Sequence, residues 1–294
     1  MNGVTELGYL RLGVSDLDAW REYAMHLGLE IADDSTENRL YLRMDLWHHR
    51  IVIVRDSADD MLAAGLRVAG PEEFAAMQQT LRDHGVAFDV VSQEEAADRH
   101  VLECLTLTDP SGVPVEIFHG PRVDTHRPFH PARRRYGRFV TGPGGLGHLM
   151  LKSDDFAQSG AFATMLGMRG GVEYRIPGPD GGFMDLWFYH CNERDHTFSY
   201  GFPTPRFAQH VMLEVDSLDD VYHTYEQVKD RYPIAIKPGK HANDGVFSFY
   251  CVSPSGVQVE IGYGGDDAKH QSEYYVGDTY GHEFVPHEVR EDAA

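Results

Sequence analysis

Four stretches of the chain show the same order of patterns, namely a strand-like alternation, a capping residue and an amphipathic helix. In the first, apolar side chains recur from Leu7 to Leu12, and Ser15-Asp16 then supplies an N-cap. The same order recurs at residues 64–73, 146–154 and 209–217. Each stretch predicts a strand followed by a helix, and their recurrence predicts an internal repeat.

The later parts of these repeats also match one another. Asp109 to Ile117 resembles Ser253 to Ile261, since both carry a Pro-Ser-Gly turn, alternating apolar residues and a glutamate. Met44-Asp45-Leu46-Trp47 is likewise expected to correspond to Met184-Asp185-Leu186-Trp187. The chain is therefore predicted to be an α+β protein of two tandem halves, each built from two βαβββ modules around a mixed sheet.

The boundary between the halves is expected in a proline-rich segment. Residues 120–141 contain three prolines and the run Arg133-Arg134-Arg135, and they show no strand or helix periodicity. We expect a first domain at residues 1–132, a linker at 133–141 and a second domain at 142–294.

The second of the two matching glutamates, Glu260, lies in a predicted β-hairpin. Phe247, Phe249 and Cys251 alternate with polar or amphipathic residues, as in a half-buried strand, and Pro254-Ser255-Gly256 makes the turn to the next strand. Because Val257, Val259 and Ile261 share the opposite face of the next strand, Glu260 points away from them. A buried carboxylate in this position can be satisfied within the core, or it can hold a metal.

Composition narrows the classes of partner. The 294 residues carry a net charge of −20, which argues against nucleic acid and anionic membranes as partners. The N-terminus has no basic region followed by an apolar run, and no apolar stretch approaches the ~18 residues of a membrane span. The three cysteines are odd in number and show no CxxC spacing, which suits a reducing compartment better than a disulfide framework. We therefore expect a cytoplasmic protein.

The two halves differ at positions that carry metal-binding side chains. The second half has His148, His210 and Glu260, where alignment of the repeats gives the first half Tyr9, Ala63 and Glu116. Any one of these side chains alone could be a satisfied polar group of the core. Two imidazoles and one carboxylate that occur together in only one half predict a single metal site, with the first half as a degenerate copy. This donor set is the one used by non-haem Fe(II) oxygenases, and Glu116 is then a structural relic.

Further polar groups surround this predicted site. His196 begins a short strand, while His241 and Tyr250 flank the arm of the hairpin that faces Glu260. His196 could equally be a loop histidine and Tyr250 a core aromatic residue. Asn243-Asp244 could form only a turn.

With these residues the chain resembles the type I extradiol ring-cleavage dioxygenases of the vicinal oxygen chelate superfamily, and in particular the 2,3-dihydroxybiphenyl 1,2-dioxygenase group. The resemblance spans the whole chain. Its signature fits Gly239-Lys240-His241, Phe249-Tyr250, Pro254-Ser255-Gly256 and Glu260. Ser253 departs from the residues usual before this proline, which is a mild change at a turn.

The resemblance implies a funnel-like mixed sheet in each half and a role for each candidate residue. His148, His210 and Glu260 would bind Fe(II), while Mn(II), which uses the same ligands, is less common in the family. His196 would be the acid–base group, and His241 and Tyr250 would contact the substrate oxygens. Asn243 and Asp244 would line the pocket, and Met150, Phe188 and Phe202 would form its apolar walls.

The resemblance also implies the reaction. A catechol, and from the apolar walls a bicyclic one, would be opened by O₂ beside its diol to give a 2-hydroxymuconic semialdehyde-type product in aromatic catabolism. Relatives are often multimeric, so a homo-oligomer is expected. Two alternatives share the fold. A glyoxalase-like isomerase would need a fourth protein ligand to the metal, and a small-molecule-binding module would not need the triad at all. The identity of the diol stays open.

Overall fold

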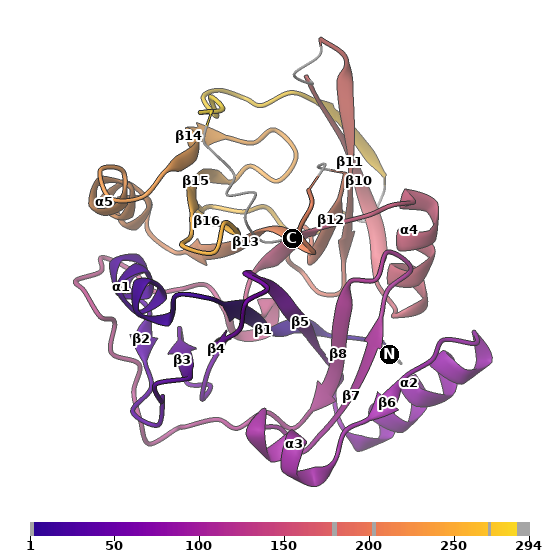
Figure 1. The fold of residues 1–294 in the computed structure, drawn as a ribbon. Helices are drawn as coiled ribbons and strands as arrows, with labels where there is room; N and C mark the ends of the chain where they lie inside the picture. The colour runs from indigo at the N-terminus through magenta and orange to yellow at the C-terminus, as the bar shows by residue number, and fades with distance from the viewer. Residues whose placement is uncertain (1–2, 178–180, 202–203, 270–271, 287–294) are drawn as a thin grey trace.

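The computed structural model describes residues 3–177, 181–201, 204–269 and 272–286, and it consists of two curved sheets, one from each half of the chain. In Figure 1 the first half lies below the second, and the helices flank the sheets. The two halves and the α+β class agree with the expectation from the repeats.

The first half contains two modules that are joined side by side. Their elements are β1 (Glu6–Val14), α1 (Leu17–Leu27), β2 (Glu30–Ile31), β3 (Arg39–Arg43), β4 (Ile51–Arg55), β5 (Asp60–Arg67), α2 (Pro71–Asp83), β6 (Asp89–Val90), α3 (Gln93–Asp98), β7 (Glu103–Thr108) and β8 (Pro114–His119). The strand order is β2-β3-β4-β1-β5-β8-β7-β6, so the first strands of the two modules pair at the centre.

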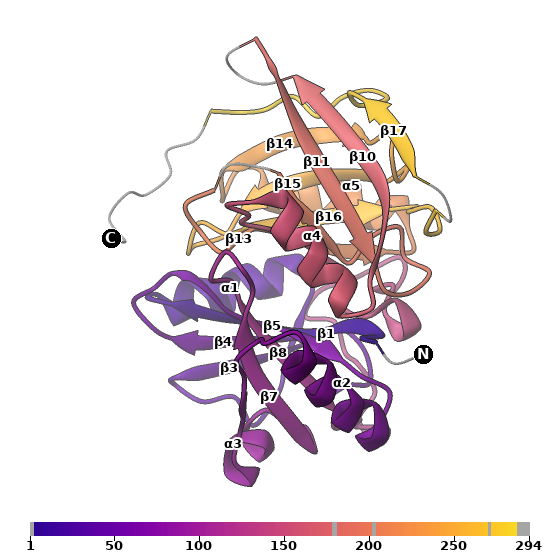
Figure 2. The same cartoon turned by 90° about the vertical axis from the view of Figure 1, so that its right-hand side faces the viewer.

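The second half repeats this arrangement and adds one strand. Its elements are the 3₁₀ turn η1 (Gly142–Gly144), β9 (His148–Leu151), α4 (Phe156–Met165), β10 (Arg169–Pro177), β11 (Phe183–His190), β12 (Phe198–Tyr200), β13 (Ala208–Val215), α5 (Leu218–Val228), β14 (Ile234–Lys240), β15 (Phe247–Val252), β16 (Gln258–Tyr263) and β17 (Glu273–Val276). The order is β14-β15-β16-β13-β9-β12-β11-β10-β17, with β17 from the tail beside β10 (Figure 2).

Local sequence explains where these elements begin. The Asp16 side chain accepts a hydrogen bond from the Ala19 amide (2.9 Å), as predicted for the cap of α1. Gly28 ends that helix with a φ of +84°, a conformation that glycine adopts without steric cost. In the hairpin of β15 and β16, Phe249 and Ile261 lie in the main core, so Glu260 faces the other side.

One predicted correspondence between the halves is wrong. The Leu10 amide bonds the Arg50 carbonyl (2.9 Å), just as the Leu149 amide bonds the Thr197 carbonyl (3.0 Å). Trp47 is therefore equivalent to Arg194 and not to Trp187, which lies inside β11. The matching tetrapeptides misled because β11 is eight residues long whereas β3 is five, so similar residues fall at different points of the module. The corrected register makes His49 the equivalent of His196.

The two Pro-Ser-Gly turns hold the halves together in a reciprocal way. The Ser111 hydroxyl accepts from the Asp154 amide of the second half (2.9 Å), and the Ser255 hydroxyl accepts from the Trp20 indole of the first half (3.1 Å). Tyr23, also on α1, donates to the Cys251 carbonyl (3.2 Å). The repeated turns thus act as an interface as well as a strand connection.

The predicted linker runs along the second half without a named helix or strand. The amides of Tyr136 and Gly137 donate to the buried Asp220 carboxylate (3.0 and 2.8 Å) on α5. The exact domain boundaries at 132/133 and 141/142 stay our proposal. In the described parts of the chain, no helix is long and apolar enough to cross a membrane.

Candidate active site

The three predicted metal ligands come from three adjacent strands of the second sheet. In the ladder, Met212 of β13 lies opposite both His148 of β9 and Glu260 of β16, and His210 lies two residues before Met212. Residues opposite one another share a face, as do residues two apart, so all three side chains lie on one side of the sheet. His148 Nε2 lies 3.1 Å from His210 Nε2, and Glu260 Oε2 lies 3.3 and 3.5 Å from these two nitrogens.

The protonation states at this cluster suit a cation. Burial lowers the pKa of His148 well below its usual value and that of His210 to about 4, which keeps both imidazoles neutral. Burial opposes ionisation of Glu260 too, but the contacts with His148 and His241 hold its pKa well below the ordinary range. The cluster therefore presents two neutral nitrogens and one carboxylate charge.

Glu260 also lacks the partners that a buried carboxylate needs. Its side chain is buried, and neither carboxylate oxygen has a hydrogen-bond partner in the described structure. An unsatisfied buried charge is costly unless it pairs or coordinates a metal. These three side chains therefore fit a divalent metal ion.

His196 lies beside the cluster and is oriented by an aspartate. Its Nδ1 is 2.9 Å from Asp195 Oδ1, and both side chains are buried. Its ring lies 3.9 Å from the His148 ring and 4.5 Å from the Phe188 ring, measured between centroids. Because a carboxylate only accepts, His196 donates from Nδ1 and leaves Nε2 for other chemistry. Asp195 was not singled out in the sequence, although it directly precedes His196.

His241 and Tyr250 form a second polar arm. His241 Nε2 lies 2.8 Å from the Tyr250 hydroxyl, and Tyr250 is directly opposite Glu260 in the ladder. Burial raises the pKa of Tyr250 well above its usual value, so its hydroxyl keeps its proton. This pair approaches the His148/His210/Glu260 cluster, since His241 Nε2 is 3.6 Å from Glu260 Oε1.

The tail after β17 completes this arm with residues that the sequence did not reveal. Asp278 Oδ1 accepts from His241 Nδ1 (2.8 Å) and from the Tyr174 hydroxyl (2.7 Å). The buried ring of His282 lies 4.2 Å from the His241 ring. Burial opposes protonation of His241, but the hydrogen bond to Asp278 raises the pKa of His241 to about 10.

With the exception of Asp195, these groups line one cavity that encloses about 720 Å³, its open mouth included. The predicted residues Met150, Phe188, Asn243 and Asp244 line it, while Phe202 lies outside the described residues. Apolar side chains that were not predicted add to the wall, namely Ile176, Leu186 and Ile236. The cavity thus combines polar groups near Glu260 with apolar walls.

Comparisons with known proteins identify the family to which the chain belongs. Residues 7–55 match the family described as dihydroxybiphenyl dioxygenase BphC D1, and residues 145–261 match the glyoxalase/bleomycin resistance protein/dioxygenase superfamily. A biphenyl-2,3-diol 1,2-dioxygenase of Sphingomonas paucimobilis is 48% identical over 285 residues, covering 96% of this chain and 95% of the relative. The chain belongs to the extradiol ring-cleavage dioxygenases.

Other relatives of this dioxygenase agree. A 1,2-dihydroxynaphthalene dioxygenase of Sphingobium xenophagum is 46% identical, with 96% of each chain covered. An iron-dependent extradiol dioxygenase of Rhodococcus jostii is 34% identical, covering 96% of this chain and 97% of the relative. The crystal structure of a catechol 2,3-dioxygenase superposes with a TM-score of 0.94 at 43% identity, covering 98% and 97% of the chains. The predicted fold and reaction class are confirmed, and the isomerase and binding-module alternatives are not favoured.

Proposed function

We propose that this dioxygenase opens a bicyclic catechol with O₂ beside its diol, at an Fe(II) ion held by His148, His210 and Glu260. The observation that carries the proposal is the buried Glu260 carboxylate, whose oxygens face two neutral imidazoles and have no hydrogen-bond partner among the described residues. When bound, Fe(II) would lower the pKa of a catechol hydroxyl and would let electron density pass from the catecholate to O₂.

His196 is proposed as the acid–base group for the second catechol proton. Asp195 fixes the tautomer in which Nδ1 donates, so Nε2 is the atom that takes and returns a proton. The cavity wall beside it, which includes Phe188, excludes water and strengthens such polar interactions.

His241 and Tyr250 are proposed to hold the substrate oxygens. If His241 carries two protons, it donates from Nδ1 to Asp278 and from Nε2 to the Tyr250 oxygen. The Tyr250 hydroxyl hydrogen is then free to donate to a substrate oxygen. Asn243 and Asp244 support this arm from the cavity lining, where both side chains are buried.

The metal is proposed to be iron on two grounds. Two histidines and one carboxylate are the donor set of non-haem Fe(II) oxygenases, and the Rhodococcus jostii relative is named for iron dependence. Mn(II) accepts the same ligands, so metal analysis of the purified enzyme and reconstitution with each ion decide between the two.

The substrate is proposed to be bicyclic because apolar side chains, among them Met150, Leu186 and Phe188, line the same cavity as the polar cluster. The two relatives with the identities of 46% and 48% are named for bicyclic diols. A second ring in contact with these walls gains ~1 kcal/mol for each methylene-sized contact, so kcat/KM should exceed that for catechol at least roughly tenfold.

The test is steady-state kinetics of the Fe(II)-reconstituted enzyme with 1,2-dihydroxynaphthalene, 2,3-dihydroxybiphenyl and catechol, followed by O₂ uptake and the yellow ring-fission product. Higher specificity for either bicyclic diol is expected. Equal or higher specificity for catechol would contradict the proposed substrate class, and the absence of O₂ uptake with every diol would contradict the function itself.

Assembly and compartment are the remaining parts of the proposal. Phe183 of β11 and Tyr274 and Val276 of β17 are exposed around the Arg175–Asp185 ion pair, and this mixed apolar and charged face suits contact with a second copy of the chain. Light scattering coupled to size-exclusion chromatography should give more than one chain per particle. The cysteines Cys104, Cys191 and Cys251 are free, which is compatible with the proposed cytoplasmic location.

A further inference from the structure

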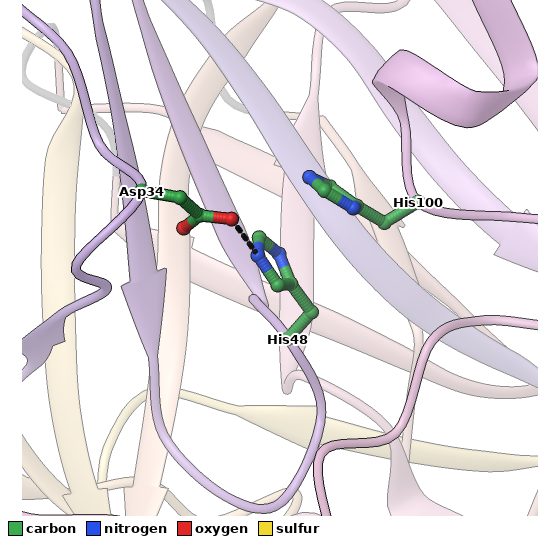
Figure 3. Close-up of side chains that lie close together, drawn as sticks. All are labelled: Asp34, His48 and His100. Atoms are coloured by element: carbon green, nitrogen blue, oxygen red, sulfur yellow. Dashed lines mark hydrogen bonds and ion pairs between the residues drawn. The ribbon is translucent and has the colours of Figure 1, made fainter. Parts of the chain in front are cut away.

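A second group of metal-binding side chains lies in the first half, outside the cavity described above. Asp34 follows β2, His48 lies in the loop between β3 and β4, and His100 lies between α3 and β7 (Figure 3). His48 Nε2 is 2.8 Å from Asp34 Oδ2, and the rings of His48 and His100 stack with centroids 3.7 Å apart. One ligand atom from each residue lies within 4.8 Å of the other two.

We propose that Asp34, His48 and His100 bind one divalent transition metal ion, with Zn²⁺ as the ion that best fits this donor set. Two imidazole nitrogens and a carboxylate oxygen, with a water as the fourth ligand, are a common tetrahedral zinc environment. Mg²⁺ and Ca²⁺ are disfavoured because they prefer oxygen ligands alone. Rotation of the His100 ring out of its stack with His48 would bring ligand atoms at these separations onto one ion.

The two histidines are held ready for such a role. His48 Nδ1 lies 3.0 Å from His49 Nδ1, which directs Nε2 toward Asp34. Fixing one ring nitrogen so that the other faces the ion is typical of metal-ligating histidines. His100 has a φ of +54° and is anchored by its backbone, since its amide bonds the Ala97 carbonyl (3.0 Å) and its carbonyl accepts from the Arg122 amide (2.8 Å).

The ring nitrogens of His100 have no hydrogen-bond partner among the described residues. The ring lies against three other aromatic rings, those of His48, Tyr41 and His49, at centroid distances of 3.7, 5.1 and 5.8 Å. A histidine in the left-handed region that makes no hydrogen bond through its side chain gains little from the protein itself. A metal ion supplies the missing interaction.

Charge and access favour a cation at this place. The carboxyl side chain of Asp34 is 44% exposed, so an ion reaches it directly from solvent. Two nearby cationic side chains are already neutralised, Arg122 by Asp124 (2.8 Å) and Arg39 by Asp98. The net charge of −20 further raises the local concentration of cations.

The position of the cluster indicates what the ion would do. β2 is one edge of the first sheet, and β7 lies next to the opposite edge strand, β6. Asp34 and His100 belong to these two sides, and the Tyr41 hydroxyl already crosses the same opening to the Asp98 carbonyl (3.4 Å). A bound ion would therefore join the two sides of the curved sheet as a brace.

The experiment uses the iron-loaded enzyme, dialysed against Zn²⁺ and analysed for both metals. We expect one zinc per chain in addition to iron, and a rise in Tm of about 5 °C at a hundredfold excess over Kd. Asp34→Asn keeps an acceptor for His48 but loses the charge, and His100→Asn removes one ligand. Both variants should lose the extra zinc while retaining iron and activity.

The matched control is His84→Asn, which changes an exposed histidine at the end of α2 and should bind zinc as the wild type does. Zinc that merely replaces iron would lower the iron content equally in every variant. If the wild type takes up no extra zinc, or if Asp34→Asn and His100→Asn both keep it, the cluster is only a hydrogen-bonded group and the proposal is wrong.

Discussion

The two halves place different chemistry on the same positions of the same sheet. Tyr9 lies opposite Gly65, and Gly65 lies opposite Glu116, just as His148 and Glu260 both lie opposite Met212. The corresponding pairs are Tyr9 and His148, Arg11 and Met150, Ala63 and His210, His49 and His196, and Glu116 and Glu260. Of these five pairs, only Glu116/Glu260 and His49/His196 have the same residue in both halves.

The shared glutamate has opposite surroundings in the two halves. Glu116 accepts from the Tyr9 hydroxyl (2.5 Å), and it pairs with Arg11 (2.6 Å) and Arg99 (2.8 Å). Glu260 instead faces imidazoles and has no hydrogen-bond partner among the described residues. Gly65 makes room for the first arrangement, because a side chain there would overlap the Tyr9 ring. Glu260 is therefore the glutamate that we propose as a metal ligand, because the described residues leave it unsatisfied, whereas Glu116 is satisfied by its arginines and Tyr9.

The largest effect is expected for Glu260→Gln. Because this carboxylate supplies the only charge among the three proposed ligands, iron content should fall to background and kcat by roughly 10³-fold or more, as several kcal/mol of metal-derived stabilisation are lost. Metal analysis and O₂ uptake check both results. A variant that retains stoichiometric iron would remove Glu260 from the ligand set.

His196 and His49 give a second contrast between the halves. His196→Ala should keep iron and anaerobic catechol binding while kcat falls by ~10²–10⁴-fold, the usual contribution of an acid–base group. His49→Ala changes the equivalent histidine of the first half and should leave kcat unaltered. Loss of iron from His196→Ala would show instead that His196 belongs to the metal coordination sphere.

Glu116→Gln should affect stability and not catalysis, the opposite of what is expected of Glu260→Gln. Iron and kcat stay near wild type, but the free energy of unfolding should fall by about 3 kcal/mol because two partly buried arginines lose their partner. Denaturant unfolding measures this loss. Burial opposes ionisation, yet Arg11 and Arg99 hold the pKa of Glu116 below its usual 4.5. The contribution is therefore complete above about pH 5, and the gap between variant and wild type should narrow as the pH falls below about 4.5.

Asp278→Asn tests the arm from the tail, which has no counterpart in the first half. Loss of the charge that orients His241 should lower kcat/KM by about tenfold with iron retained, in line with the cost of removing groups that orient active-site residues. Glu283→Gln, which changes an exposed ion pair with Lys237 in the same segment, is the control. Equal effects of the two changes would mean that the tail acts only through general stability.

The smallest effect is expected at the apolar wall, where the second half has Met150 and the first has Arg11. Met150→Ala removes an apolar contact with the second ring that contributes roughly 1 kcal/mol of binding free energy. The preference for a bicyclic diol over catechol should therefore fall about fivefold. The ratio of the two kcat/KM values measures it. An unchanged ratio would place the second ring elsewhere in the cavity.

The sequence predicted the parts of the site that lie on strands. Alternation placed the Glu260 side chain on the face of its strand away from Val259 and Ile261, and the repeat placed His148 and His210 on the central strands. Both arguments succeed because they depend only on strand geometry. Their assignment as metal ligands remains a proposal.

The sequence did not predict contacts that depend on tertiary folding. Asp278 and His282 reach His241 from a tail that has no periodic pattern, across 37 residues in the case of Asp278. The register error at Trp47 hid the equivalence of His49 and His196, because strand lengths differ between modules that otherwise match. Likewise, nothing local shows that Glu116 is neutralised by Arg99, which approaches from the end of α3.

The reciprocal contacts between the halves bear on how the chain folds as it is synthesised. Trp20 and Tyr23 lie on a helix made early, yet their partners Ser255 and Cys251 follow 235 and 228 residues later. Contacts of such long range slow folding and leave apolar surface uncovered in the meantime. The first half therefore emerges from the ribosome with one face of α1 uncovered, and until the second half is made that face is available to chaperones and to other nascent chains.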